Sequence, residues 1–442
     1  MINDFVFKNI SEPNIDLVKS RANLVPNEEY TVDELKDGID RAMGTQLFSQ
    51  ITFSPLFEDD QIKFEVEGHE KAKHQIKGSL HYDTQRGVGL IVNYTGRNII
   101  GEASRFLVTL DIAQQPGFRI HYQNNFGHRK EWWWSSEILG QLLTQEFYFE
   151  GVKAEDLDND FFQFDNEFNK NINSLKSFYG LGLNYESTSF KPANKSEIAD
   201  NVFGMEDYRF KNIEINFHFD LNTLNRVFFP TKGRFLYAEI SRSLYHHVKY
   251  NFSDHSKPNI NGETNGFTKF NLTFEQRLPL HHKITGIIGA SVGFNFIDEI
   301  QEGEHSYLDY GTGGTYFLGG GILRPRKDTF LFKGLNDSEL YASQFMMLNL
   351  GLQTHLTSSL LLTPHFNIAS VGNTGFGDYI KKAFSPSGDW QDLDEASLLL
   401  SGGVTASYDS FLGPVNFDVS YVNKINKIRI FFGIGIPLNR SN

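Results

Sequence analysis

The chain has 442 residues, 14% aromatic content, 39 glycines, no cysteine and a formal net charge of -13. The lack of cysteine excludes disulfides, thiolate metal sites and a cysteine nucleophile. The acidic balance argues against nucleic acid as a partner, because nucleic-acid binders usually present a basic face. No run of about 18 apolar residues predicts a transmembrane helix. The best candidate, residues 284–297, is short and contains polar residues.

Residues 1–70 predict a small β-α-α-β-β domain. Phe5–Ile10 is typical of a strand, a helix is expected after Pro13, and two further strands are expected over Phe48–Phe57 and Gln61–Glu67. In the last of these, apolar and charged residues alternate, as they do in a strand with one buried face.

The second helix of this domain has clear end signals. Thr31-Val-Asp-Glu34 is a capping box, in which the Thr31 side chain accepts from the Glu34 amide and Glu34 reaches back to the cap. Gly44 stands where the end of the helix would favour a left-handed residue.

From residue 71 to residue 442, apolar and polar residues alternate in long runs, clearest over 213–219, 270–274, 346–352 and 428–436. Several runs reach about nine residues, the length that a tilted strand needs to cross a bilayer. The polar positions include charged residues that a packed soluble core could not bury unpaired. We therefore expect a mainly β protein, a 16-stranded antiparallel transmembrane β-barrel with lipid outside and a wet lumen inside.

Four polar stretches, 153–173, 253–263, 301–336 and 373–394, are expected to be long loops on one side of the barrel. The run Trp132, Trp133 and Trp134 is expected to form part of an aromatic girdle at a membrane interface, where amphipathic rings prefer to lie.

Residues 220–233 read D-L-N-T-L-N-R-V-F-F-P-T-K-G and predict a turn between two transmembrane strands. The residues that define the pattern are Asp220, Asn225, Phe229, Pro230 and Gly233. The proline cannot donate to a strand ladder and the glycine permits a tight re-entry. The segment resembles the hairpin of the bacterial surface antigen superfamily, in which an Asp and an Asn lead into F-P-x-x-G.

A second segment resembles the lumen loop of the same superfamily, a G-G followed by an R-G-F/Y motif that is tucked into the barrel. Gly319 and Gly320 supply the glycine pair, and Lys333 and Gly334 stand at the R-G position. Lysine replaces the motif arginine, with two arginines nearby at 324 and 326.

The superfamily includes BamA-type assembly factors and two-partner secretion transporters, and residues 1–70 resemble their periplasmic POTRA domain. The resemblance implies a POTRA-like domain over 1–70 in the periplasm and a barrel over 71–442 in the bacterial outer membrane. It implies protein assembly, translocation or display, with outer-membrane lipid and a client polypeptide at the periplasmic domain as partners. The resemblance implies no cofactor or metal. It leaves both a monomer and a homo-oligomer as alternatives.

Asp4 and Lys8 interrupt any apolar run near Met1, so the sequence shows no signal peptide. Together with the single N-terminal module, this favours the superfamily's patatin-like phospholipase branch, in which a lipase domain lies upstream. The chain would then be the anchor or conduit of a lipase that it does not itself contain.

Two alternatives remain from the sequence. A passive porin would share the strand ladder but not the N-terminal module. An esterase would use Ser291 of Gly289-Ala-Ser-Val-Gly293, which matches the G-x-S-x-G nucleophile elbow. The elbow needs a strand, a sharp turn and a helix, whereas Ser291 lies within an alternating apolar run. We therefore expect no catalytic site in this chain.

Overall fold

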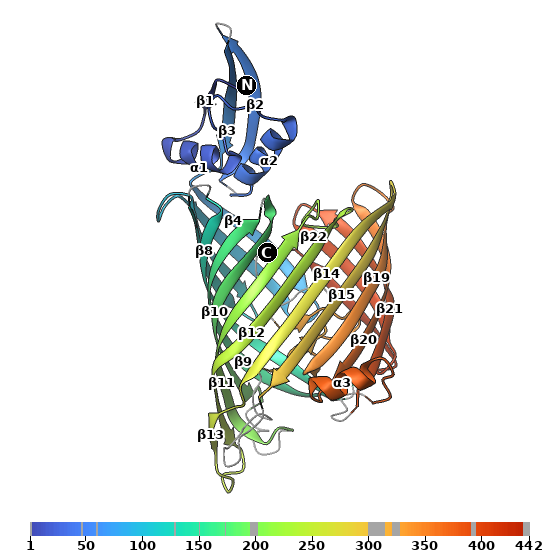
Figure 1. The fold of residues 1–442 in the computed structure, drawn as a ribbon. Coiled ribbons are helices and arrows are strands. Elements are labelled where there is room, and N and C mark those ends of the chain that lie inside the picture. The colour runs from blue at the N-terminus through green and yellow to red at the C-terminus, as the bar shows by residue number, and fades with distance from the viewer. Residues whose placement is uncertain are drawn as a thin grey trace.

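The computed structural model describes residues 2–45, 47–58, 61–127, 130–149, 151–172, 174–194, 202–298, 314–320, 328–389 and 395–435. A small N-terminal domain stands on one end of a barrel (Figure 1). We call the end that meets this domain the near end and the opposite end the far end. None of the described helices is long and apolar enough to span a bilayer.

The N-terminal domain packs two helices on a three-stranded sheet, in the expected order β-α-α-β-β. Its elements are β1 (Asp4–Lys8), α1 (Glu12–Ala22), α2 (Val32–Met43), β2 (Phe48–Glu58) and β3 (Gln61–Glu70). The sheet order is β1-β3-β2, with β1 parallel and β2 antiparallel to the central β3. Leu17, Val18 and Phe48 are buried between helices and sheet.

The expected capping box of α2 is confirmed. The Glu34 amide donates to Thr31 Oγ1 at 3.2 Å, and the Thr31 amide donates to Glu34 Oε2 at 2.8 Å. The expected left-handed Gly44 is wrong, because this glycine is right-handed with φ -69°. The Thr45 hydroxyl donates to the Ala42 carbonyl at 2.7 Å, so the helix end is satisfied without a left-handed turn.

Turns at the near end of the barrel hold the N-terminal domain. Ala103, between β5 and β6, is buried in the core of that domain. Arg21 of α1 donates to Asn125 Oδ1 at 2.9 Å, and Asn98 donates to Asn14 Oδ1 at 2.9 Å. Burial lowers the pKa of Arg21 to about 10. Because polar groups buried here have partners across the joint, side-chain contacts as well as the connecting chain hold the domain on the barrel.

The remaining strands form one closed antiparallel barrel. Sixteen of the described strands build its wall. They are β4 (His74–Asp83), β5 (Gly87–Arg97), β6 (Ser104–Ala113), β7 (Gly117–Phe126), β8 (Trp132–Phe149), β9 (Val152–Ile172), β10 (Ser174–Pro192), β11 (Met205–Asn222), β12 (Gly233–Phe252), β14 (Phe267–His281), β15 (Ile284–Ile297), β19 (Gln344–His355), β20 (Leu360–Gly372), β21 (Ser397–Ser410), β22 (Gly413–Val422) and β23 (Lys427–Ile434). The expected mainly β, 16-stranded barrel is therefore confirmed.

The wall is uneven in height. The strands β8 to β12 have 18 to 21 residues, whereas β4 to β7 have 10 or 11. The tall strands extend past the short ones at the far end, where β13 (Ile260–Glu263) adds to β12 (Figure 1). The short strands are those next to the place where the barrel closes.

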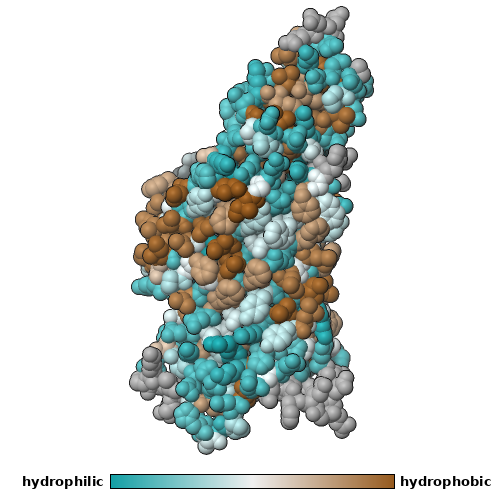
Figure 2. Space-filling model, turned by 90° about the vertical axis from the view of Figure 1, so that its left-hand side faces the viewer, coloured by the Kyte–Doolittle hydropathy of each residue, from teal (hydrophilic) through white to brown (hydrophobic). Residues whose placement is uncertain are grey.

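Alternation separates the two faces of the wall. On β11, Ile215 and Phe217 are 44% and 47% exposed on the outer face, whereas Glu214, Asn216 and His218 are buried on the inner face. On the face seen in Figure 2, hydrophobic residues gather over the middle of the barrel and hydrophilic residues predominate at the far end. An apolar outer band and a polar inner face are the arrangement of a membrane-spanning barrel.

The expected loop over 153–173 is wrong, because residues 152–172 form β9. Phe162 and Phe164 lie on its outer face, and Asn159 and Gln163 are buried on its inner face. The stretch looked like a loop because a strand whose inner face meets a wet lumen has polar residues at every second position, and acidic residues crowd its far half.

The other expected loops also contain structure. The stretch 253–263 includes β13, and 373–394 includes the helix α3 (Phe376–Ala383). The stretch 301–336 lies partly outside the described residues, and its described part enters the lumen.

The three tryptophans begin β8 at the near end. On the outer face, Trp134 contacts Tyr122 with ring centroids 5.5 Å apart, and Trp132 contacts Phe168 at 5.2 Å. Neighbours on a strand point to opposite faces, and Trp133 packs against Phe178 on the inner side. The girdle therefore stays a prediction for Trp132 and Trp134 and does not extend to Trp133.

The two faces of β19 give a matched test of the barrel. We expect Leu350→Lys, on the outer face at mid-strand, to lower the free energy of unfolding by about 2–4 kcal/mol, the effect of a lysine at the bilayer midplane. The inward neighbour Asn349→Lys should change it far less. Urea unfolding in lipid vesicles measures both, and equal losses would contradict the assignment of the faces.

Candidate functional site in the barrel lumen

The connection between β15 and β19 folds back into the barrel, and we call residues 314–343 the lumen loop. Its described part forms a small sheet of β16 (Tyr316–Leu318), β17 (Thr329–Phe330) and β18 (Leu340–Ala342), in the order β17-β16-β18. This sheet rests on an apolar patch of the inner wall.

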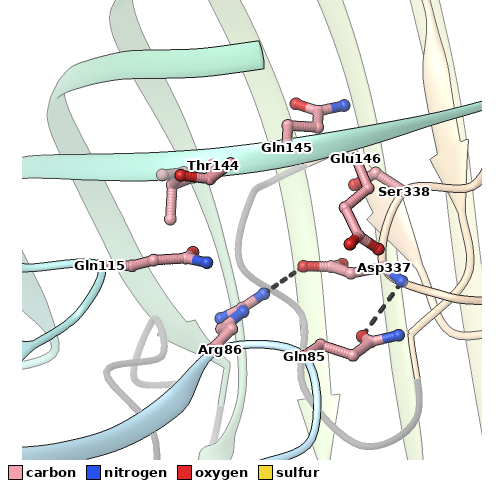
Figure 3. A pocket seen from close by; sticks show the side chains of 9 residues that line it. Gln85, Arg86, Gln115, Thr144, Gln145, Glu146, Asp337 and Ser338 are labelled. Carbon is pink, nitrogen blue, oxygen red and sulfur yellow. Dashed lines mark hydrogen bonds and ion pairs between the residues drawn. The ribbon is translucent and has the colours of Figure 1, made fainter. Parts of the chain in front are cut away.

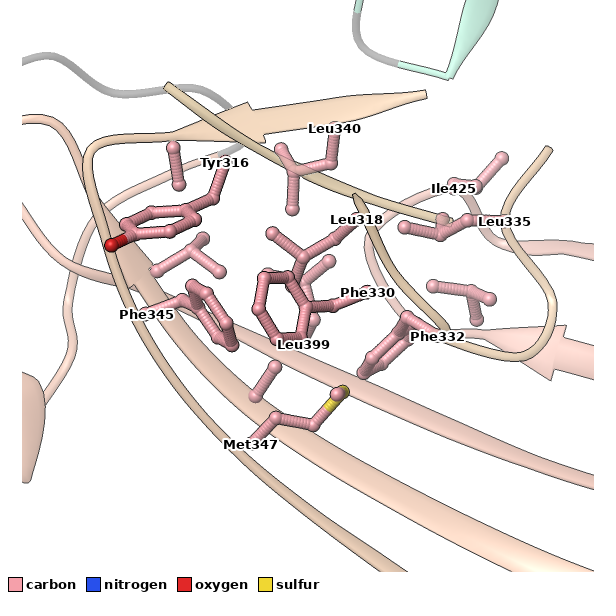
Figure 4. Close-up of a cluster of buried hydrophobic side chains, with 14 residues drawn as sticks. Tyr316, Leu318, Phe330, Phe332, Leu335, Leu340, Phe345, Met347, Leu399 and Ile425 are labelled. Atoms are coloured by element: carbon pink, nitrogen blue, oxygen red, sulfur yellow. The ribbon is translucent and has the colours of Figure 1, made fainter. Parts of the chain in front are cut away.

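An apolar cluster between the small sheet and the barrel wall is buried (Figure 4). From the loop it takes Tyr316, Leu318, Phe330, Phe332, Leu335, Leu340 and Ala342, and from β19 to the β22–β23 turn it takes Phe345, Met347, Ala369, Val371, Leu399, Val422 and Ile425. Burial of this apolar surface inside an otherwise polar lumen stabilises the loop at this place on the wall, because exposing the surface to water would be unfavourable.

Polar contacts fix the loop to the wall at β14 and β15. The Tyr316 hydroxyl lies 3.1 Å from both the Phe270 and Phe294 carbonyls. Lys269 of β14, 2% exposed, lies 2.6 Å from Asp328 Oδ2 of the loop and 2.9 Å from Glu214 Oε1 of β11. A buried charge needs such partners, since an unpaired one is strongly unfavourable.

The backbone conformation of the lumen loop requires glycine at 319, 320 and 334, the glycine positions of the lumen-loop motif. Gly319 has φ +143°, and a Cβ there would lie 2.0 Å from the Asn336 carbonyl. Gly320 has φ +83°, and its amide donates to the same carbonyl at 2.9 Å. Gly334 has φ +93°, and a Cβ there would lie 2.6 Å from Val422. Only glycine allows both the positive φ and the close approach.

Lys333, at the position of the motif arginine, points into the inner wall. Its Nζ donates to Thr405 Oγ1 at 2.5 Å and lies 3.6 Å from Asp418 Oδ2. The Asp418 carboxylate also accepts from Thr405 at 2.6 Å and pairs with His365 Nε2 at 2.9 Å. The nearby arginines at 324 and 326 lie outside the described residues. Lysine thus places a positive charge beside a buried carboxylate, without the forked geometry of arginine.

The barrel closes where the first strand meets the last, and we call this joint the seam. Among the described residues, β23 pairs with β4 through Gly433↔Asp83 and Ile434↔Tyr82. The Thr84 amide continues the joint by donating to the Phe432 carbonyl at 3.0 Å.

A turn of the lumen loop, Asn336–Glu339, binds both sides of the seam, and we call it the seam clamp. On the β4 side, Arg86 lies 2.6 Å from Asp337 Oδ2, and Gln85 Oε1 accepts from the Asp337 amide at 3.1 Å. On the β23 side, Arg429 Nη2 donates to Glu339 Oε1 at 2.9 Å, and its other nitrogen also contacts this carboxylate. Paired arginine–carboxylate contacts of this kind are strong and directional.

A polar pocket lies beside the clamp (Figure 3). In the figure, Arg86 reaches Asp337 from the β4–β5 turn, and Glu146 points toward the same place from β8. The pocket is lined by Gln85, Arg86, Gln115, Leu143, Thr144, Gln145, Glu146, Asp337 and Ser338.

The F-P-x-x-G motif of residues 220–233 forms the connection between β11 and β12 at the near end. Asn225 Oδ1 accepts from the Thr231 and Lys232 amides at 3.0 and 3.1 Å. Gly233 has φ +104°, and a Cβ there would lie 2.2 Å from the Thr223 carbonyl. The turn also holds Phe229, with φ +49°, and a buried Pro230. Asp220 is buried within β11, before the turn.

Ser291 lies in the middle of β15, not at a strand–helix turn. It is 2% exposed on the inner face, and its Oγ lies 3.4 Å from Thr273 Oγ1. This position gives it neither a base nor an exposed elbow. In the described part of the chain, no group of three or more His, Asp or Glu side chains could hold a metal ion.

The sequence did not point to the clamp. Arg86 and Asp337 are separated by about 250 residues, so no local pattern links them. Arg429 was visible only as one polar position in an alternating strand.

Breaking the clamp should loosen the loop. We expect Arg429→Ala to leave Glu339 buried without its main partner and to increase amide hydrogen exchange in β16 and β18, since losing one partner of a buried pair is destabilising. The double variant Arg429→Ala/Glu339→Gln should recover part of the protection, because the charge is removed with its partner. Unchanged exchange in the single variant would show that the clamp does not hold the loop. Hydrogen-exchange mass spectrometry measures all three proteins.

Comparison with known proteins places this architecture. The sequence profile of the Omp85 superfamily domain matches residues 98–437, and no curated protein matches the sequence. BamA from Haemophilus ducreyi lacking POTRA domains 1–3 has the same fold, with a TM-score of 0.61 and 13% identity over 98% of this chain and 83% of that chain.

CdiB from Acinetobacter baumannii gives a TM-score of 0.57 with 9% identity, over 98% of this chain and 73% of that chain. CdiB from Escherichia coli gives 0.57 with 11% identity, over 98% and 75%. At these identities the likeness shows the fold alone, but the superfamily profile spans most of the barrel wall, the lumen loop and the β11–β12 turn. The chain therefore belongs to the Omp85 superfamily, whose barrels lie in the bacterial outer membrane.

Proposed function

We propose that this barrel handles polypeptide at the outer membrane, by inserting, translocating or displaying it. The observation that carries the proposal is the seam clamp, a lumen turn that binds the first hairpin through Asp337 and the last strand through Glu339. A passive pore has no need for a device inside the lumen that holds its closing strands together.

The chemistry of an opened seam suits a polypeptide client. Separating β23 from β4 would expose two rows of backbone N–H and C=O groups, which are unfavourable in hydrocarbon without partners. An incoming extended segment can satisfy them by strand addition. A clamp that both sides of the seam share would keep this edge covered until a client arrives.

The uneven wall supports the same function. Beside the seam, β4 has 10 residues and β5 has 11, about the minimum that a tilted strand needs to cross a bilayer. Strands of this length have no residues to spare, so they match only the hydrocarbon thickness that they just span. A client strand entering there would cross the least hydrocarbon.

The N-terminal domain, in this proposal, is a periplasmic POTRA-like module over residues 1–70 that receives the client before it reaches the barrel over 71–442. In its described sheet β2 is an edge strand, paired with β3 alone. An edge strand can accept an extended segment by backbone pairing. The near end would then face the periplasm and the far end the outside.

The finer assignment to the patatin-like phospholipase branch stays a proposal that rests on the resemblance. It makes the chain the anchor or conduit of a lipase domain. A lipase domain encoded immediately upstream of Met1 in the native gene would support it, and a signal peptide directly before Ile2 would end it.

Planar-bilayer recording separates the proposal from a passive porin. The lumen loop and its buried cluster lie inside the barrel, so we expect a mostly closed channel with rare openings. A large, steady, solute-permeable conductance from the folded protein would instead favour the porin.

Locking the seam tests the proposed function. The chain has no cysteine, so Tyr82→Cys/Ile434→Cys can form one disulfide across paired positions of β4 and β23. We expect the oxidised variant to lose client insertion or secretion and the reductant to restore it. The readout is the level of outer-membrane and secreted proteins in the source bacterium, with this variant as its only copy.

The matched control is Leu272→Cys/Val292→Cys, which joins paired positions of β14 and β15 away from the seam. It should leave protein levels unchanged in either redox state. Full activity with the seam quantitatively crosslinked would rule out an opening between β4 and β23.

A further inference from the structure

The helix α3 lies outside the barrel, on the membrane-facing side of its wall. It crosses the strands at the far end (Figure 1). Tyr379, fully buried, packs over Gly372, and its hydroxyl donates to the Ser370 carbonyl at 2.9 Å. Met346, next to these residues on the outer face of β19, packs against the same helix.

The outer face beneath α3 continues the apolar band of the barrel. The Phe376 ring lies 5.0 Å from that of Phe294 and 4.9 Å from that of Phe296. On β15 these two phenylalanines alternate with the inward-facing Asn295. The helix is therefore joined to the lipid-facing wall by direct ring contacts.

Three stripes run along the helix. Tyr379 and Ala383 are buried against the barrel. Phe376 and Ile380, both half-buried, and Phe384, the residue that caps the end of the helix, follow at intervals of four. Phe384 is 79% exposed.

The polar stripe carries the remaining side chains. Asp378 and Lys381, 69% and 75% exposed, form an ion pair at 2.8 Å. Lys382 pairs with Glu395 at 2.7 Å. The basic side chains of α3 thus already have acidic partners on the protein.

We propose that α3 is an interfacial membrane helix whose stripe Phe376–Ile380–Phe384 inserts into the lipid leaflet at the far end. A helix that lies in the membrane plane needs one apolar and one polar face, and α3 adds a third that fixes it to the barrel. The lipid is argued from continuity, because the stripe extends the ring contacts of the lipid-facing wall. The proposal is independent of what the barrel transports.

The paired charges define the kind of lipid contact. Because Lys381 and Lys382 have carboxylate partners on the protein, the helix should not depend on anionic headgroups. Its insertion should follow the apolar stripe alone and be the same with neutral and with acidic lipids.

Nitroxide labelling tests this directly, since every introduced cysteine is the only one. Phe384→Cys reports the apolar stripe and Lys381→Cys the polar stripe, one turn away. Leu350→Cys on the outer wall and Lys257→Cys in an exposed far-end turn give the lipid and water references. The full chain is refolded into phosphatidylcholine vesicles, with and without phosphatidylglycerol.

For each label we take the ratio of its relaxation by oxygen, which concentrates in lipid, to its relaxation by a water-soluble nickel chelate. We expect this ratio to be several-fold higher for the label at 384 than for the label at 381. The ratio at 384 should resemble that at 350 and be independent of phosphatidylglycerol. A ratio at 384 equal to that at 257 would overturn the proposal. So would dipolar broadening that grows with the protein-to-lipid ratio, which would assign the stripe to a second copy of the chain.

A second measurement does not need the label. Phe384→Trp should be quenched by lipids brominated in the acyl chains, beyond the quenching of the parent protein, whereas Lys381→Trp should not. Equal added quenching in the two variants would also overturn the proposal.

Discussion

Hydrogen-bond closure of the sheet is the constraint on which the rest of the structure depends. An unpaired backbone amide in hydrocarbon is unfavourable by several kcal/mol, so the last strand must return to the first. Between most neighbouring strands, one continuous hairpin makes the joint. The seam instead joins residues near 83 to residues near 433, so the chain itself does not hold the two strands together. The carboxylates of Asp337 and Glu339 supply that connection from inside the lumen.

The lumen loop can act there because two different kinds of interaction position it. The apolar cluster around Phe330 and Phe345 fixes its location without specifying direction. The ion pairs of Lys269, Arg86 and Arg429 with carboxylates of the loop then fix its orientation, because turning the loop away would separate these opposite charges. A loop held by the cluster alone would stay in the lumen and yet leave the seam free.

Local patterns predicted what local physics decides. Alternation predicted the barrel, and the capping box from Thr31 to Glu34 began its helix as expected. The glycines at 233, 319 and 334 were identified by motif, and positive φ explains them. The sequence could not show the clamp, because residues about 250 apart share no local pattern. It also could not show β9, because the inward-facing asparagine and glutamine side chains of this strand are typical of a loop. The sequence did not predict the helix α3, because eight residues inside a polar stretch show the helical spacing of apolar residues only weakly.

The supports of the wall are distributed unevenly around the barrel. Strands β19 and β20 meet the lumen-loop cluster on the inside, through Phe345 and Val371, and α3 on the outside, through Met346 and Ser370. Strand β4 is paired with β5 on one side and with β23 on the other, and the clamp contacts the turn that follows it. Packing on two faces opposes displacement of a strand in either direction, whereas the clamp opposes only separation along its ion pairs. Any opening of this closed barrel should therefore begin at the seam, while β19 and β20 act as the fixed frame.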